Sequence, residues 1–338
     1  MRSFLGIEIG GTKLQIAVGR GEGEPFRGFW RGTIDAQAGA GRIQEQIVVG
    51  VDELLSRTGL TREAIAGVGI GFGGPVDSAG GRIVVSNQVA GWQGFPVVEW
   101  AQERLGWPAV LHNDADTAAL AEARFGAGRG FDPVMYVTVG SGIGGGLVIG
   151  GKIYRGQGAG AMEIGHLRPS RSRLRISLPA PSVESVASGF GVENRARLTL
   201  EEWLQANPPS ARGRPAAIPD RLLPLMELVQ NPSAGLTTRR IAECAIAGDA
   251  FSRDLLADAT DTLGWALAQA ATLLNPGRIV IGGGVSLIGE EYFFQPVRRA
   301  FGEAVFQPFA GLAEIVPAAL GEDVVVFGAL ALARDAFN

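Results

Sequence analysis

The sequence predicts an α/β fold made of two similar halves, each of which opens with a glycine-rich β-hairpin. Two stretches carry this prediction, residues 4–19 (FLGIEIGGTKLQIAVG) and 136–151 (YVTVGSGIGGGLVIGG), because apolar residues alternate on both sides of a glycine turn. A mononucleotide- or dinucleotide-binding glycine loop opens a helix instead. Glycine supplies 51 of the 338 residues, about twice the usual share of roughly 7%. The turns let the backbone approach another group closely, and their amides can face a phosphate.

Strands and helices alternate through the rest of the chain, which indicates sheets covered by helices. The expected elements are helices at 43–57, 96–105, 183–206 and 237–274, strands at 65–72 and within 275–285, a strand, turn and helix within 107–126, and a final strand and helix within 323–336. Asp114 or Asp116 is placed to cap the helix within 107–126. Residues 207–235 contain six prolines and are expected to be irregular.

Charge and cysteine content exclude several classes of protein. The chain has 30 Lys and Arg against 34 Asp and Glu, a net charge of −4, so it offers no basic surface for nucleic acid. Its single cysteine, Cys244, excludes an internal disulfide and fits a reducing compartment. The first residues lead directly into a strand, without the apolar region of a signal peptide. Polar residues interrupt the apolar stretch 263–289, so we expect no membrane span and a cytoplasmic protein.

Seven short motifs follow one another along the chain. They are IGGTK (9–13), GGPVD (73–77), NDADTAALAEA (113–123), GSGIGGG (140–146), EIGH (163–166), VESVASG (183–189) and NPGRIVIGGG (275–284). In this order they resemble the ROK family of sugar kinases and related repressors, from residue 4 to about residue 335, with a poor match over 205–240.

The resemblance implies the two-lobed actin-like ATPase (ribonuclease H-like) fold. In that fold two duplicated α/β lobes flank a cleft, with ATP on one side and the sugar deep between the lobes. We therefore expect a small lobe over residues 1–112, joined by a C-terminal helix at about 323–338, and a large lobe over 113–322.

Asp114 is the expected catalytic residue. Phosphoryl transfer to a sugar hydroxyl needs a carboxylate that accepts the proton and orients the oxygen, and an Asp between a strand and a helix is rigidly held. Taken alone, the NDAD sequence is equally compatible with a helix cap. The resemblance also implies that Asn113 binds the sugar, whereas Asp116 stands where the family usually has Asn and receives no role.

Glu163, His166 and Glu184 match the family's hydroxyl-binding trio. Carboxylates and an imidazole suit a polyol, because each can share hydrogen bonds with neighbouring hydroxyls. Gly74 and Asn87 are expected to complete the sugar pocket, although SNQVAGW has one residue more between Asn and Gly-Trp than the usual family pattern.

Three glycine turns are expected to hold ATP. The resemblance assigns them Gly10, Gly11, Thr12 and Lys13 in the first hairpin, Gly140, Ser141 and Gly142 in the second, and Gly282, Gly283 and Gly284 on the nucleoside side. Glu8 replaces the family's usual Asp, which helps to hold Mg²⁺, often through water. The longer side chain keeps the charge but moves the carboxylate by one methylene, so the metal geometry can differ.

No zinc site is expected, although most family members follow the EIGH histidine with three zinc-binding cysteines. The segment 167–182 has no cysteine, and Cys244 is distant in sequence, whereas a structural zinc takes about four ligands. This segment instead contains Arg168, Arg171, Arg173 and Arg175. We favour a solvated surface for these arginines over a site for an anionic sugar or polyphosphate.

The expected function is ATP-dependent phosphorylation of a hexose, at the 6-hydroxyl as in a glucokinase. The alternative is a catalytically weak sugar-binding or sensor protein, motivated by Glu8 and the altered segment 167–182. DNA binding by this chain is not expected, because the chain is acidic and begins on the first hairpin. The resemblance further implies a homodimer, and the identity of the sugar stays open.

Overall fold

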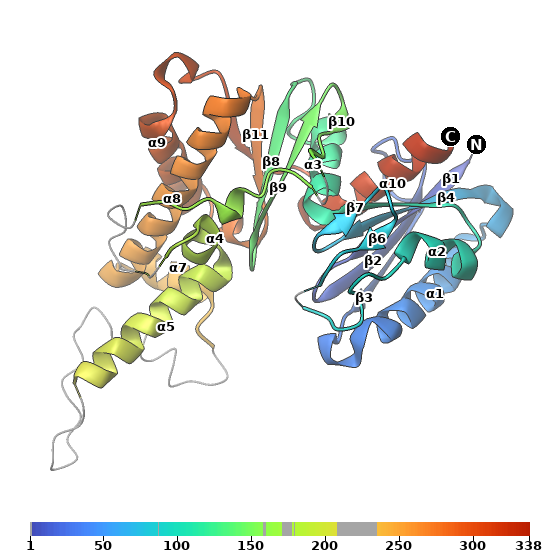
Figure 1. Cartoon of the computed structure of the whole chain (residues 1–338), viewed down its shortest axis with the longest axis horizontal. Helices are drawn as coiled ribbons and strands as arrows, with labels where there is room; N and C mark the ends of the chain where they lie inside the picture. The colour runs from blue at the N-terminus through green and yellow to red at the C-terminus, as the bar shows by residue number, and fades with distance from the viewer. Residues whose placement is uncertain (1, 87, 158–159, 171–177, 179, 208–234) are drawn as a thin grey trace, which may run out of the picture.

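Two five-stranded mixed sheets with the same connectivity form the centres of two lobes (Figure 1). The structure is a computed structural model and describes residues 2–86, 88–157, 160–170, 178, 180–207 and 235–338. The first sheet has the order β3-β2-β1-β4-β7 and the second has the order β10-β9-β8-β11-β12. In each sheet three antiparallel strands precede two parallel ones. The predicted α/β fold with two similar halves is confirmed.

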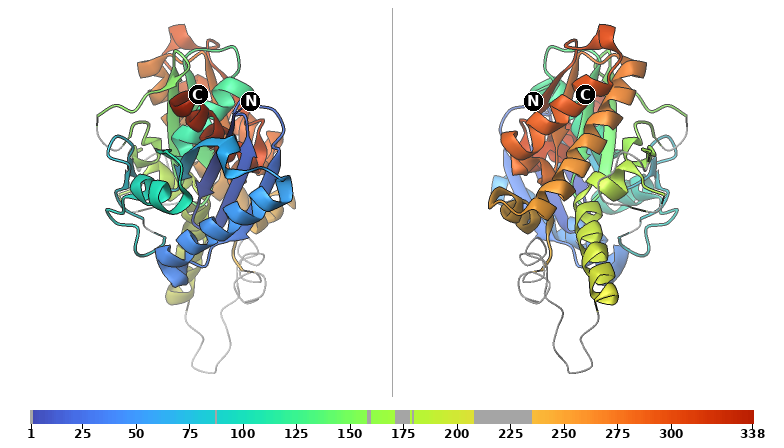
Figure 2. Two further views of the ribbon diagram at one scale, coloured as in Figure 1. Left: turned by 90° about the vertical axis from the view of Figure 1, so that its right-hand side faces the viewer. Right: turned by 90° about the vertical axis from the view of Figure 1, so that its left-hand side faces the viewer.

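The first sheet is covered on one face by α1 and α2 and on the other by the last helix of the chain, α10 (Figures 1 and 2). Its elements are β1 (Ser3–Ile9), β2 (Lys13–Gly19), β3 (Gly28–Thr33), α1 (Gly39–Thr58), β4 (Ile65–Phe72), α2 (Val97–Leu105), β7 (Ala109–Asn113) and α10 (Val324–Phe337). A small hairpin of β5 (Val76–Asp77) and β6 (Arg82–Ile83) follows β4. Ile43, Ile47 and Leu54 of α1 are buried against the sheet, since they recur at helical spacing on its apolar face.

The second sheet is likewise enclosed, with α3 on one face and α8 on the other. Its elements are α3 (Asp114–Phe125), β8 (Val134–Val139), β9 (Ile143–Ile149), β10 (Lys152–Ile153), α4 (Val183–Ala187), α5 (Gly189–Ala206), α7 (Thr238–Ile246), α8 (Ala250–Leu274), β11 (Arg278–Gly282), α9 (Gln295–Ala304) and β12 (Glu314–Pro317). Helix α8 also packs along α9 on the outer side of this lobe (Figure 2).

Helices α3 and α10 meet where the two lobes join. A Cβ on Gly328 of α10 would overlap the carbonyl oxygen of Thr117 in α3, and one on Gly69 of β4 would overlap the carbonyl oxygen of Ala329. Glycine therefore permits the close backbone contact that fastens α10 to the small-lobe sheet and to the first helix of the large lobe. Because α10 lies on the small-lobe sheet, the C-terminus ends beside the N-terminus (Figure 1).

The structure corrects several expected elements. The strand expected within 323–336 is absent from these described residues, because Val324, Val325 and Val326 belong to α10 and a 3-10 turn precedes them. The helix expected at 183–206 is two helices separated at Ser188, and the one at 237–274 breaks at 247–249. Most of the irregular segment 207–235 lies outside the described residues. None of the described helices is long and apolar enough to span a membrane.

Candidate active site

A cavity of about 430 Å³ lies between the lobes and is lined by both hairpin turns. Most of the residues predicted to bind sugar or phosphate contribute to its wall: Glu8, Gly10, Gly11, Thr12, Lys13, Gly74, Asn113, Asp114, Gly140, Ser141, Gly142, Glu163, His166 and Glu184. Asn87 lies outside the described residues. Segments far apart in the sequence thus converge on one cavity.

Asp114 is held at the junction between β7 and α3. Asn113 is the helix cap, since its Oδ1 accepts hydrogen bonds from the backbone N–H of Ala115 (2.8 Å) and of Asp116 (3.3 Å). The prediction that Asp114 or Asp116 caps this helix is therefore wrong. Asn113 Nδ2 donates to the carbonyl of Gly74 at 2.9 Å and ties the cap to the neighbouring turn.

The cap leaves the Asp114 carboxylate available to the cavity. Its Oδ1 accepts a hydrogen bond from the N–H of Ala115 at 2.8 Å. Burial raises the pKa of Asp114 to about 6, and this hydrogen bond and the charge of Lys13 oppose the shift. The proton affinity of this carboxylate is therefore well above that of an exposed aspartate.

Glu184 is fixed to the second hairpin. Its Oε2 accepts a hydrogen bond from the N–H of Ile143 at 2.7 Å. A Cβ on Gly142 would come within 2.6 Å of this oxygen, so the glycine lets the carboxylate lie close to the hairpin backbone. Ser182 and Ser185 form a capping box at the start of α4, which fixes the turn that carries Glu184.

Glu163 and His166 come from a short 3-10 turn beside β9. The N–H of His166 donates to the carbonyl of Glu163 at 3.0 Å, so the two side chains extend from one compact turn into the cavity. A Cβ on Gly165 would come within 2.5 Å of the carbonyl oxygen of Ile143. Glycine is therefore what allows the EIGH turn to lie against the second hairpin.

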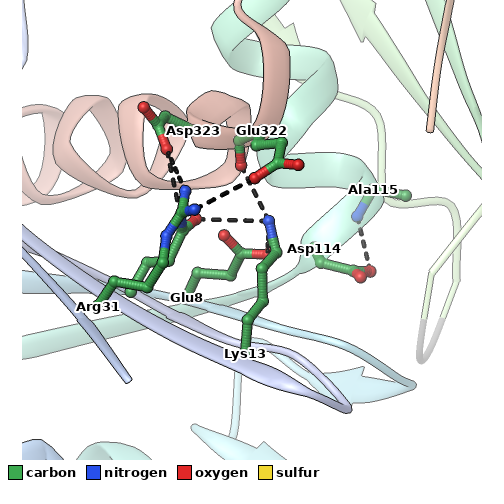
Figure 3. A network of polar contacts seen from close by, with 8 residues as sticks. Glu8, Lys13, Arg31, Asp114, Ala115, Glu322 and Asp323 are labelled. Carbon is green, nitrogen blue, oxygen red and sulfur yellow. Dashed lines mark hydrogen bonds and ion pairs between the residues drawn. The ribbon is translucent and has the colours of Figure 1, made fainter. Parts of the chain in front are cut away.

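An ion-pair network joins the first hairpin to the start of α10 (Figure 3). Lys13 Nζ lies 3.1 Å from Glu8 Oε1 and donates to the carbonyl of Glu322 at 2.9 Å. The guanidinium of Arg31 lies 3.3 Å from a carboxylate oxygen of Glu322 and 3.2 Å from one of Asp323. The head group of Lys13 is thereby held at the wall that it shares with Asp114.

Glu8 is the buried member of this network, with 4% of its surface exposed. Burial raises the pKa of Glu8 to about 7, although the Lys13 ammonium opposes the shift. Glu8 Oε2 is enclosed and has no hydrogen-bond partner among the described residues. A carboxylate oxygen of this kind fits a cation or a water bound to a cation, as expected for Mg²⁺.

The predicted nucleotide turns line two further cavities that adjoin Lys13. One, of about 440 Å³, reaches from Asp114 to Gly282, Gly283 and Gly284, and the other, of about 920 Å³, runs from Gly140 and Ser141 to Gly284. Gly283 has φ 88° and lies against Val139, where a Cβ would come within 2.5 Å of the carbonyl oxygen. The third glycine turn therefore packs on the end of β8, beside the second hairpin.

Gln88 and Asp116 also line the central cavity, and the sequence prediction missed both. A Cβ on Gly11 would overlap the Gln88 side-chain oxygen, so this amide lies directly on the first hairpin turn. The extra residue in SNQVAGW was the available signal, because Gln88 has the usual spacing to Gly91 when the motif is counted backwards. For Asp116, the signal in the sequence was that an Asp stands where the family usually has Asn.

No group of three or more His, Cys, Asp or Glu that could hold a metal ion occurs in the described part of the chain. Arg168 donates to the carbonyl of Ala180 at 3.0 Å. The three other arginines of the segment, Arg171, Arg173 and Arg175, lie outside the described residues.

The chain is similar over almost its whole length to known sugar kinases. The sequence profile of the ROK family matches residues 4–336. A glucokinase of Halalkalibacterium halodurans is 30% identical over 329 residues, which are 97% of this chain and 93% of the relative. A ROK hexokinase from Thermus thermophilus matches with a TM-score of 0.76 and 27% identity over 98% of this chain and 97% of that one. A ROK family glucokinase from Streptomyces griseus, solved in complex with glucose and AMPPNP, matches with a TM-score of 0.75 and 29% identity over 98% and 99%.

Proposed function

The chain belongs to the ROK family and is a sugar kinase, and we propose that it transfers the γ-phosphoryl group of ATP to the 6-hydroxyl of a hexose. We propose Asp114 as the general base. The observation that supports this role is the position of its buried carboxylate, which shares one cavity with the hydroxyl-binding side chains and with both hairpin turns.

The sugar is proposed to bind between the two lobes through its hydroxyls. Glu163, His166, Glu184 and Asn113 all line the cavity. Carboxylate oxygens accept from hydroxyls and an imidazole can donate or accept, so this set can satisfy several neighbouring hydroxyls at once. A sugar that lacks one of these hydroxyls would leave a polar group unpaired and bind more weakly.

Asp114 is proposed to act on the hydroxyl that becomes phosphorylated. Its carboxylate accepts the hydroxyl proton while the sugar oxygen forms a bond to the γ-phosphorus and the bond from this phosphorus to the bridging oxygen of ADP breaks. The raised proton affinity of Asp114 suits a base that must take up a proton near neutral pH.

Lys13 and the amides of the hairpin turns are proposed to hold the phosphates. Lys13 lines all three cavities, so its ammonium can reach a phosphate in each of them. Glu8 would hold Mg²⁺, directly or through water, because its enclosed Oε2 has no protein partner. When bound with ATP, Mg²⁺ supplies charge neutralisation at the β- and γ-phosphates.

A coupled ADP-release assay over a panel of hexoses tests the proposal. At least one hexose should stimulate ATP turnover, and NMR of the product should show phosphate at carbon 6. Asp114→Asn should lower kcat by about 10²–10⁴ while the sugar still raises the thermal stability of the variant. The wild-type kcat/KM should also fall as pH drops through about 6, since burial raises the pKa of Asp114 to about 6 and only the ionised carboxylate accepts a proton.

Glu103→Gln, on the exposed face of α2, is the matched control and should leave turnover unchanged. If no sugar stimulates turnover while a sugar still stabilises the protein, the kinase proposal is wrong and the sugar-sensor alternative replaces it. The lobe boundaries at residues 112 and 322, the homodimer and the cytoplasmic location remain predictions. Light scattering tests the homodimer directly.

A further inference from the structure

Acidic groups outnumber basic ones around the central cavity. Five carboxylates line it, those of Glu8, Asp114, Asp116, Glu163 and Glu184. Among the described residues, the basic side chains in the same wall are Lys13 and His166, and Lys13 is already paired with Glu8 at 3.1 Å. The sugar side of the cavity therefore carries an excess of negative charge.

Asp116 is the carboxylate in this wall that the proposed mechanism does not use. It lies in the first turn of α3, is 5% exposed and lines the cavity. Its Oδ1 is fully enclosed and has no hydrogen-bond partner in the described part of the chain. A buried carboxylate without a donor is costly, because it loses its hydration and gains nothing in exchange.

The other carboxylates of the wall have protein partners or water. Glu8 faces Lys13, Asp114 accepts from the N–H of Ala115, and Glu184 accepts from the N–H of Ile143. Glu163 is exposed, so water can solvate it. In this set Asp116 is the one that combines an enclosed oxygen with no hydrogen bond or ion pair from the described residues at either oxygen, whereas Glu8 still pairs with Lys13 through its other oxygen.

The surroundings of Asp116 add no compensating cation inside the cavity. Burial raises the pKa of Asp116 to about 7, and the charges of Asp114 and Glu163 add to the shift while Arg155 opposes it. Arg155 is exposed and does not line the cavity. A cation that enters with the substrate would therefore supply what the protein leaves out.

We propose that Asp116 selects a hexose that carries a free, protonated amine, so that the preferred substrate class is an aminohexose. This inference rests on the proposed sugar-kinase function and names the substrate of the same site. An ammonium group offers three donors and a positive charge, whereas a hydroxyl offers one neutral donor. A charge-assisted hydrogen bond is shorter and about twice as strong as a neutral one.

A purely structural role for Asp116 makes a different prediction. An acidic residue in the first turn of a helix interacts favourably with the helix dipole whatever occupies the cavity. In that case the charge of Asp116 would not affect the choice between an amine and a hydroxyl on the substrate.

Binding and turnover of three matched sugars separate these roles. Calorimetric titration and the ADP-release assay at pH 7 compare glucose, glucosamine and N-acetylglucosamine, since acetylation removes the charge but keeps the nitrogen. The panel also includes mannosamine and 3-amino-3-deoxyglucose, because the amine can lie on another ring carbon. We expect at least one free amine to exceed its parent sugar in affinity and kcat/KM by about tenfold or more, and its acetylated form to lose this advantage.

Asp116→Asn keeps the shape of the side chain and removes its charge. The ratio of kcat/KM for the amino sugar to kcat/KM for its parent sugar should fall to about one in this variant, mainly through a change in KM. Glu103→Gln should leave this ratio as in the wild type. Equal affinity of the wild type for every amine and its parent sugar would overturn the inference even if the variant did not fold. Turnover of neutral hexoses with no amine preference refutes only this inference, while absence of turnover with every sugar refutes the kinase proposal.

Discussion

The pH dependence of folding offers an independent test of the buried charge at Asp116. The perturbation is Asp116→Asn, which removes an ionisable group that is 5% exposed. Burial and the neighbouring carboxylates raise the pKa of Asp116 from the ordinary value of 3.8 to about 7. Between these two values the folded state binds a proton more tightly than the unfolded state, so wild-type stability falls as pH rises from about 4 to about 7.

The magnitude follows from the size of the shift. One pKa unit corresponds to ~1.36 kcal/mol, so the rise from 3.8 to about 7 destabilises the folded state by ~4 kcal/mol once Asp116 is fully ionised. About 2–3 kcal/mol of this destabilisation develops between pH 5 and pH 8. The variant has no carboxyl to ionise at position 116. Its free energy of unfolding should therefore rise by the same amount relative to that of wild type over that interval.

The assay is urea unfolding without sugar at pH 5, 6, 7 and 8 and at constant ionic strength, followed by circular dichroism and tryptophan fluorescence. Any packing cost of the amide is independent of pH and cancels when the two ends of the range are subtracted. Glu103→Gln makes the same charge change on an exposed face of α2. Its free energy of unfolding should change with pH as that of wild type does. If Asp116→Asn also runs parallel, within about 0.5 kcal/mol, Asp116 does not ionise in a buried site and the reasoning fails.

Three further predictions concern the sugar trio and metal binding. His166→Ala should raise the sugar KM by about tenfold, since it removes a hydrogen bond to the substrate, and a chelator should leave the melting temperature of the apoprotein unchanged. A chelator that unfolds the protein would show that a structural metal had been missed. Glu8→Gln should raise the Mg²⁺ concentration for half-maximal turnover by about tenfold or more, because it removes the charge of the buried carboxylate next to Lys13. An unchanged Mg²⁺ titration would assign Glu8 to the ion pair with Lys13 alone.

The hairpin strands of both sheets could be predicted because their signal lies in residues that are close together in the sequence. The two hairpins alternate apolar residues on both sides of a glycine turn, and that period alone is enough to identify them. The run Val324–Val326 misled the prediction because β-branched residues favour strands. In the structure this run packs between α3 and the first sheet, and that tertiary environment makes it the first turn of α10.

The site was harder to predict where a role depends on what surrounds a residue. Asn113, Asp114 and Asp116 are all short and polar, and all suit a helix start, so sequence could not tell which one is the cap. The backbone direction at β7 decides it, because the Asn113 side chain reaches the N–H groups of Ala115 and Asp116. Likewise, the enclosure of Asp116 depends on segments distant in sequence, including the turn that holds Glu163.

The replacement of the family's usual Asp by Glu8 is compatible with phosphoryl transfer. Lys13 has three donors, and its shortest contacts are to Glu8 at 3.1 Å and to the carbonyl of Glu322 at 2.9 Å. Its contact with Gln15 Oε1 is weaker, at 3.4 Å. A phosphate oxygen can therefore replace Gln15 without breaking the pair with Glu8. Arg31 pairs with the carboxylate of Glu322, whose carbonyl accepts from Lys13, and the second oxygen of Glu8 has no hydrogen-bond partner among the described residues.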